Sequence, residues 1–381
     1  MRKNSLLVLI ATVLLWQSMA KSISASSNQD FDKILSTSWQ AYKRQFIQAD
    51  GRVIDWTNNK ITTSEGQSYA LLRAVWMNDR QTFDTTLKWT YENLRARGDN
   101  LFSWKWGLNS TTQKWEVLDK SAASDADQDI ALALLLAYRR WHQREMLAQA
   151  RAIIADIWNA EIVEINGQPY LVAGDWAKSM PAPALNPSYF APYAYRLFAE
   201  IAPERDWNGL IDSSYRVLEE STKLSNVNLP PDWCSINRET GAIEPIQLNG
   251  EVSGDYSYDA WRAMWRVSLD AIWYDEPRAK NFIKRAKFIF DFWRKHEHLA
   301  EAFTKDGAVR SDVESIAALG VHLPAFSIID KKTAKRIYEE RLLASYRRLG
   351  ERGFWGNPND YYGQNWAWFG IALYAGALNR F

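Results

Sequence analysis

The sequence contains very little cysteine and histidine. Cys234 is the single cysteine among 381 residues, so the chain cannot form an intrachain disulfide. The 4 histidines are scattered and show no spacing typical of a metal site. We therefore interpret Cys234 as a structural thiol, and we expect neither a metal ion nor another cofactor.

An excess of charge of either sign is also missing. The chain has 46 Lys and Arg against 45 Asp and Glu, which gives a net charge of +1. Such a balance creates no field that would attract nucleic acid or an anionic membrane. With 47% hydrophobic and 24% charged residues, the composition argues against disorder and allows a large core.

Long apolar runs are absent beyond the N-terminus. Arg2 and Lys3 precede the apolar run 6–16, which is too short to span a bilayer easily, and small residues follow at 18–20. We predict a signal peptide at residues 1–20 and a single domain at 21–381, either secreted or periplasmic. An uncleaved membrane anchor is the alternative.

Aromatic residues, in contrast, are abundant. The chain has 20 Trp and 17 Tyr, whose flat apolar faces and polar edges suit the faces and hydroxyl rims of sugars. Large helical cores also absorb aromatic residues. Several of the tryptophans lie in polar loops, however, which favours carbohydrate binding.

Apolar residues recur with helical periodicity along most of the chain. The pattern predicts about twelve helices, at residues 31–48, 65–78, 80–97, 125–141, from 143, after 189, 207–221, from 258, after 277, 313–319, 331–349 and 362–378. Links from an even to the next odd helix are mostly short. Links from odd to even are long, and residues 101–118 and 162–172 are typical of β-hairpins.

This alternation predicts an all-α fold, an (α/α)6 barrel of six helical hairpins with small β-hairpins in the long loops. Even-numbered helices would form the inner ring. The stretch 130–137 (Ile-Ala-Leu-Ala-Leu-Leu-Leu-Ala) supports this arrangement, because a helix that is apolar all round is buried.

Acidic residues open three of the even-numbered helices. Glu65, Asp125 and Asp259 stand at these starts, and Tyr189 precedes another. Because inner helices of such a barrel run in one direction, we expect all four side chains at the same end. The alternative is ordinary capping: Ser124 is a suitable N-cap, and acids in a first turn suit the helix dipole.

Paired carboxyl groups can break the acetal bond between two sugars. One donates a proton to the leaving oxygen, and the other attacks the sugar or activates a water. The donor must keep its proton near neutral pH, whereas a helix N-terminus favours the charged form. If Glu65 is the donor, burial and neighbouring acids such as Asp125 must outweigh the dipole.

Four segments are similar to those of a known enzyme family. They are 53–69, which contains Thr-Thr-Ser-Glu-Gly-Gln-Ser-Tyr; 114–119, Lys-Trp-Glu-Val-Leu-Asp; 123–131, Ala-Ser-Asp-Ala-Asp-Gln-Asp-Ile-Ala; and 186–189, Asn-Pro-Ser-Tyr. They resemble glycoside hydrolase family 8, above all its endo-β-1,4-glucanases that accompany bacterial cellulose synthesis. The resemblance covers nearly all of residues 21–381.

The resemblance implies an (α/α)6 barrel and inversion at the anomeric carbon. Glu65 would be the proton donor, Asp259 the base that activates water, and Asp125 a third essential acid that holds and distorts the sugar. Tyr189 would help to orient the water. Arg262, one turn after Asp259, could keep that residue ionised.

Other residues are candidates for substrate binding. Asp127 is one, although structural capping explains it equally well. Trp104, Trp106 and Trp115 lie in the long loop before the fourth helix. We expect at least one of the three to stack on glucosyl units; the alternative is that they pin the hairpin to the barrel.

The leading hypothesis is an inverting, monomeric endo-β-1,4-glucanase that acts on cellulose or soluble glucan. Its partners would be the β-1,4-glucan and a cellulose synthase complex, with no nucleic acid and no membrane after signal cleavage. A same-fold glycosidase acting on xylan, mixed-linkage glucan or chitosan is the second hypothesis. A noncatalytic glucan-binding component of an export machine is the third.

Overall fold

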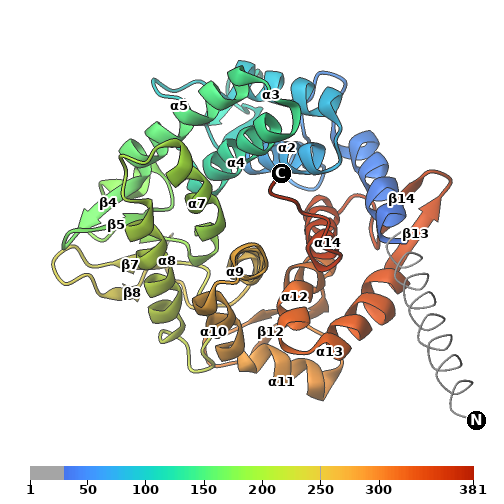
Figure 1. Ribbon diagram of the computed structural model, residues 1–381. Helices are drawn as coiled ribbons and strands as arrows, with labels where there is room; N and C mark the ends of the chain where they lie inside the picture. The colour runs from blue at the N-terminus through green and yellow to red at the C-terminus, as the bar shows by residue number, and fades with distance from the viewer. Residues whose placement is uncertain (1–29, 249) are drawn as a thin grey trace, which may run out of the picture.

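The computed structural model describes residues 30–248 and 250–381, whose helices form two concentric rings (Figure 1). The inner ring consists of α2 (Ser64–Trp76), α4 (Ser124–Trp141), α7 (Pro192–Ile201), α9 (Tyr258–Tyr274), α12 (Ile316–Ile329) and α14 (Tyr361–Tyr374). The outer ring consists of a helix at 30–46, α3 (Arg80–Leu94), α5 (Arg144–Glu161), α8 (Trp207–Thr222), α10 (Pro277–Arg285), α11 (Lys287–His296) and α13 (Lys331–Arg336). The predicted (α/α)6 barrel is thus confirmed. Its inner ring consists of the helices that were second, fourth, sixth, eighth, tenth and twelfth in the sequence prediction.

Burial explains why these helices occupy the centre. Every residue of α4 from Ser124 to Ala137 is buried, as expected for a helix surrounded by other helices. Aromatic side chains fill the space near the barrel axis: Tyr69 contacts Trp366 and Phe369 edge-on, and Trp265 packs against the same two rings. Much of the high aromatic content is therefore core.

Two glycines set the close packing of α12 against α14. A Cβ atom on Gly320 would lie 2.2 Å from the carbonyl oxygen of Trp366, and one on Gly370 would lie 1.9 Å from that of Gly320. Such distances are far below van der Waals contact. The backbones can touch here because neither residue has a side chain.

Contacts between the two ends of the described chain close the ring. The indole of Trp368 in α14 donates a hydrogen bond to the carbonyl of Leu35 in the first helix, at 3.1 Å. Arg73 of α2 donates to the Asn365 side chain, also at 3.1 Å. Helix α2 therefore takes its place beside the last helix of the chain.

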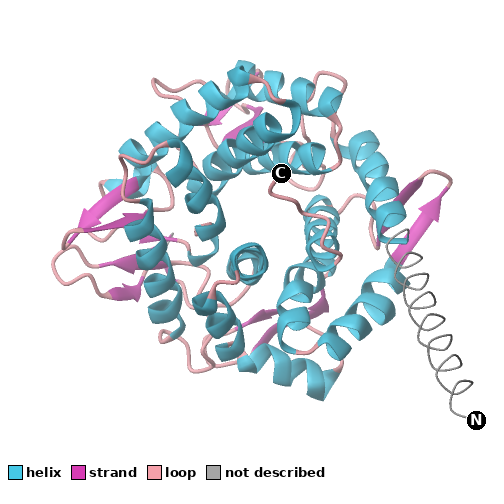
Figure 2. Ribbon diagram, in the orientation of Figure 1, coloured by secondary structure: helices cyan, strands magenta, loops and turns pink. Residues whose placement is uncertain are grey.

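Short β-strands occupy the long connections (Figure 2). They form the pairs β4 (Ile162–Ile165) with β5 (Gln168–Leu171), β9 (Gln247–Leu248) with β10 (Glu251–Val252), β11 (Ala300–Phe303) with β12 (Val309–Glu314) and β13 (Tyr346–Leu349) with β14 (Arg352–Trp355). Three-stranded sheets join β1 (Thr62–Thr63), β2 (Lys105–Leu108) and β3 (Trp115–Asp119), and β6 (Ala184–Leu185), β7 (Cys234–Ile236) and β8 (Ile243–Pro245). Both hairpins predicted from the sequence are present.

Three predicted helices run into a strand, a π-helix or a break in the structure. The tenth does not include 313–315, because β12 runs to Glu314 and the side chain of Ser315 caps α12 through the Ala318 N–H. The eleventh does not reach 349, because a π-helix (Ile337–Leu343) follows α13 and β13 begins at Tyr346. The ninth is divided at Ala286 into α10 and α11.

The predicted signal peptide at 1–20 lies outside the described residues. Within residues 30–248 and 250–381, none of the helices combines the length and apolar character that crossing a bilayer demands.

We predict that Gly370→Ala destabilises the barrel, because the new methyl group would overlap the α12 backbone. Overpacking of this kind costs about 1–3 kcal/mol or more. Thermal unfolding should show a clearly lower midpoint than the unsubstituted protein.

Gly98→Ala is the matched control, since a Cβ atom there would meet nothing within 4 Å. Equal midpoints for the two variants would contradict the proposed role of the glycine contact.

Candidate active site

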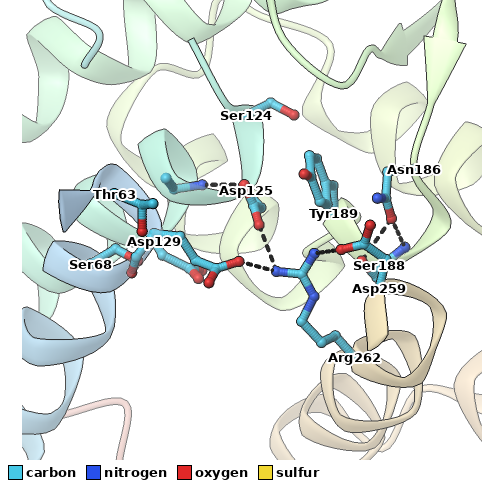
Figure 3. Close-up of polar contacts among 12 residues, drawn as sticks. Thr63, Ser68, Ser124, Asp125, Asp129, Asn186, Ser188, Tyr189, Asp259 and Arg262 are labelled. Carbon is cyan, nitrogen blue, oxygen red and sulfur yellow. Dashed lines mark hydrogen bonds and ion pairs between the residues drawn. The ribbon is translucent and has the colours of Figure 1, made fainter. Parts of the chain in front are cut away.

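Three carboxylates occupy the same place in three inner helices. Glu65, Asp125 and Asp259 are each the second residue of their helix, in α2, α4 and α9. Tyr189 ends the short 3-10 helix Pro187–Tyr189 that precedes α7. Asp125, Tyr189 and Asp259 lie close to Arg262 in Figure 3. Arg262 also contacts Glu65, so the convergence expected from the sequence is present.

The two helices that carry Glu65 and Asp125 begin differently. The Thr63 side chain caps α2 by accepting the Gly66 N–H at 3.0 Å, which places Glu65 in the first turn. The prediction that Ser124 caps α4 is wrong, because Ala123 is the N-cap residue. The backbone N–H of Ser124 instead donates to the Ala173 carbonyl at 3.1 Å, so a neighbouring loop supports this helix start.

One guanidinium group connects the three acids. Nη1 of Arg262 donates to Glu65 Oε2 at 2.5 Å and to Asp125 Oδ2 at 2.9 Å, and Nη2 donates to Asp259 Oδ1 (Figure 3). Bonds between charged partners are among the strongest hydrogen bonds in proteins. Arg262 therefore holds Glu65 and Asp259 apart, one beside each of its terminal nitrogens.

Exposure divides the three acids into two kinds. The side chain of Asp125 is 2% exposed and that of Arg262 1%, whereas Glu65 is 26% and Asp259 31% exposed. Glu65 and Asp259 can thus meet a molecule in the solvent, while Asp125 lies beneath them. Two accessible carboxyl groups on either side of a fixed cation form a site suited to paired proton transfers.

The pKa of Glu65 is raised to about 7, chiefly by burial, against the opposing charge of Arg262. The negative charges of Asp125 and Asp259 add to the rise. Burial likewise raises the pKa of Asp259, while Arg262 and a hydrogen bond from Trp233 oppose the rise. The helix dipole expected to keep Glu65 ionised is therefore outweighed.

A cleft of about 760 Å³ leads away from Asp259. Its lining includes Tyr189 and the tryptophans Trp104, Trp176 and Trp233. The guanidinium carbon of Arg262 lies 5.3 Å from the centre of the Tyr189 ring, so this ring covers the cation. Aromatic faces beside carboxylates form a surface that suits a sugar chain.

Trp106 and Trp115 lie elsewhere. Their rings stack on each other with centroids 5.2 Å apart, and the Arg52 guanidinium carbon lies 4.4 Å and 4.5 Å from them. Trp106 also packs edge-on against Trp89 of α3. These contacts attach the β2–β3 hairpin to the barrel and favour the pinning alternative for both residues, whereas Trp104 faces the cleft.

Asp127 is completely buried below the cleft. Its Oδ1 atom accepts the backbone N–H of Phe102 at 3.0 Å, so the carboxyl group fastens the 101–103 loop to α4. Burial raises its pKa well above the usual range. The contacts of Asp127 favour the structural alternative.

Among the cleft residues that the sequence did not single out are Trp176, Asp232 and Trp233. The indole N–H of Trp233 donates to Asp259 Oδ2 at 3.1 Å. The sequence signal at this place is weak, because Asp232 and Trp233 follow two prolines in a loop without periodicity. A loop acid next to a tryptophan can be recognised as part of the site only once α9 is placed beside it.

Comparisons with known proteins identify the family of the chain. A family model described as "Glycosyl hydrolases family 8" matches residues 4–371. Endoglucanase A of Acetivibrio thermocellus is 31% identical over 346 residues, which cover 87% of this chain and 68% of the relative. An endoglucanase of Escherichia coli strain K12 is 29% identical over 342 residues, 86% of each protein.

A solved structure shares the fold. The endo-1,4-D-glucanase from Vibrio fischeri ES114 superposes with a TM-score of 0.75 at 25% sequence identity, covering 88% of this chain and 94% of that one.

Removing the central cation should destabilise the protein most at neutral pH. Arg262→Met would leave three carboxylates without their partner, and breaking a buried ion pair costs about 3–5 kcal/mol. Burial already raises the pKa values of Glu65 and Asp259 against the opposing charge of Arg262, so without the guanidinium these two pKa values should lie still further above their unfolded values. The acids then take up protons as the pH falls, and the loss of unfolding free energy should shrink.

Urea unfolding at pH 7 and pH 4.5 measures this difference. Arg336→Met is the control, because that arginine lies on the surface and its removal should change little at either pH. A loss for Arg262→Met that is the same at both pH values would contradict the prediction.

Proposed function

Because this chain belongs to glycosyl hydrolase family 8 and is therefore a glycoside hydrolase, we propose that it is an inverting endo-β-1,4-glucanase. Its substrate would be cellulose or a soluble β-1,4-glucan, cut at internal bonds, as the names of its endoglucanase relatives suggest. The observation that carries the proposal is the pair of accessible carboxyl groups, Glu65 and Asp259, on either side of Arg262.

In this proposal Glu65 is the general acid. The raised pKa of Glu65, about 7, means that much of the population carries a proton in mildly acidic and neutral solution. That proton passes to the glycosidic oxygen as the bond from this oxygen to the anomeric carbon breaks. Burial, not the helix dipole, is what makes the group a donor.

Asp259 is the proposed base. It accepts a proton from a water molecule, whose oxygen attacks the anomeric carbon from the face opposite to the leaving group, so the configuration inverts. Arg262 and Trp233 donate to the two carboxylate oxygens of Asp259, which favours its ionised form against burial. We propose that Tyr189, which lies beside Arg262, orients the water.

Asp125 and the cleft complete the proposed machinery. Asp125 binds Arg262 and raises the pKa of Glu65, and we propose that it also holds the sugar at the cleavage point. Among the predicted tryptophans, Trp104 faces the cleft and is the one proposed to stack on a glucosyl unit. An open cleft suits cleavage inside a chain, because the glucan can extend beyond the acids.

The cellular setting is a further part of the proposal. The similarity of the 53–69 and 123–131 segments to endoglucanases that accompany cellulose synthesis favours nascent glucan as the natural substrate. We propose that the protein is secreted or periplasmic, after removal of residues 1–20, and that it works as a monomeric single domain near a cellulose synthase.

Replacing the proposed acid should strongly reduce the catalytic rate without unfolding the protein. Glu65→Gln should lower the rate on carboxymethylcellulose by about 10²–10⁴-fold, as for loss of a general acid. In the unsubstituted enzyme, activity should fall as the pH rises through about 7, because Glu65 then loses its proton. Reducing-end release across a pH series measures both effects.

Glu116→Gln, on strand β3 and outside the cleft, is the matched control. Binding of carboxymethylcellulose without any reducing ends from the unsubstituted protein would instead favour the noncatalytic hypothesis.

The stereochemistry of the product tests the role of Asp259. Proton NMR of fresh cello-oligosaccharide digests should show the α-anomer first, and Asp259→Asn should lower turnover by orders of magnitude. A β-anomer at the earliest times would mean retention and would exclude Asp259 as a water-activating base.

A further inference from the structure

The N-terminus of α9 lacks a cap from its own sequence. Ser257 is the N-cap residue, yet its side chain makes no capping hydrogen bond to the helix. A helix start normally needs an acceptor for the N–H of its second or third residue. Asp259, the proposed base, lies within this uncapped turn.

Asp232, from the segment before β7, supplies the missing acceptor. Its Oδ1 atom accepts the N–H of Ala260 at 2.8 Å and that of Ser257 at 3.2 Å, and its Oδ2 atom accepts the Ser257 hydroxyl. Ala260 is the third residue of α9, so Asp232 occupies the place of an N-cap side chain. It thereby fixes the backbone on both sides of Asp259.

Trp233, the next residue, fixes the side chain. Its indole N–H donates to Asp259 Oδ2 at 3.1 Å, while Arg262 binds Oδ1. The ring itself is held edge-on by Tyr189, with centroids 5.8 Å apart. Both oxygens of Asp259 are therefore oriented by a donor.

The 232–233 segment is itself anchored. The backbone N–H of Asp232 donates to the Asp255 carbonyl at 2.9 Å, and that of Trp233 donates to the Ser253 hydroxyl at 3.1 Å. These acceptors belong to the loop that leads into α9. A rigid frame of this kind is what a reacting carboxylate needs, because an error of about 1 Å can cost 10²-fold in rate.

We propose that Asp232 and Trp233 are positioning residues that hold the backbone and the carboxylate of Asp259 in the orientation needed to activate water. The inference rests on the proposed function, since it takes Asp259 as the base. Trp233 also tunes this base, because a hydrogen bond to the charged form favours ionisation. The other titratable or charged groups around Asp259 are Glu65, Asp125, Tyr189, Asp232, Arg262 and Tyr362.

Trp233→Phe keeps the ring and removes the donor. Asp259 should then hold its proton more tightly, so the low-pH limb of kcat should move to higher pH by about 1 unit. Trp176→Phe is the matched control: Trp176 lines the same cleft and packs against Trp233, but its indole donates no hydrogen bond to an acid among the described residues. Its low-pH limb should stay in place.

Asp232→Ala removes the cap and should lower kcat by roughly 10- to 100-fold with little change in KM. Asp232→Asn keeps the oxygen that accepts the Ala260 N–H and should recover most of this loss. A merely structural role would lower the thermal unfolding midpoint of Asp232→Ala without separating kcat from KM. Each variant is measured as the full chain, with its unfolding midpoint beside its kinetics.

Asp259→Asn distinguishes a failure of the proposed function from a failure of the positioning inference. If this variant keeps near wild-type turnover, the proposed function fails. If it is inactive while Trp233→Phe leaves the low-pH limb unmoved, or Asp232→Ala matches the unsubstituted kcat, the positioning inference is overturned and the proposed function stands.

Discussion

The ion cluster around Arg262 is the interaction on which the site depends. Three carboxylates at one end of a barrel would repel one another, and a buried guanidinium is what allows Glu65, Asp125 and Asp259 to approach it together. The cation does not make all three alike, since burial still raises the pKa of Glu65 to about 7. One residue thus gathers the acids and leaves one of them able to hold a proton.

A second ion pair continues this arrangement into the barrel. Arg266, one turn after Arg262 on α9, binds Asp129, one turn after Asp125 on α4, through two bonds of 2.9 Å and 2.8 Å. The same two helices are therefore linked at two successive levels, which fixes their rotation relative to each other. The Arg262 cluster faces the cleft, whereas the Arg266–Asp129 ion pair is completely enclosed. A buried ion pair within the aromatic core therefore lies directly below the site.

The barrel and its inner ring could be predicted from the helical periodicity of the sequence. Glu65, Asp125 and Asp259 all begin even-numbered predicted helices. Because these helices run in the same direction around the ring, the sequence placed the three acids at one end. Contacts made by loops could not be predicted in this way. Asp232 caps α9, which begins 26 residues later at Tyr258, and no local sequence pattern indicates a capping residue so distant in the chain. The prediction that Ser124 caps α4 was wrong for the same reason, because the Ala173 carbonyl that binds this turn is distant in sequence.

Ring closure links the helix that carries Glu65 to both ends of the described chain. The helix that carries Glu65 rests on α14, and the first helix is bonded to Trp368 near the end of the chain. A polypeptide that lacked α14 would keep Glu65, Asp125 and Asp259 but would leave both the first helix and α2 without a neighbour that completes the ring.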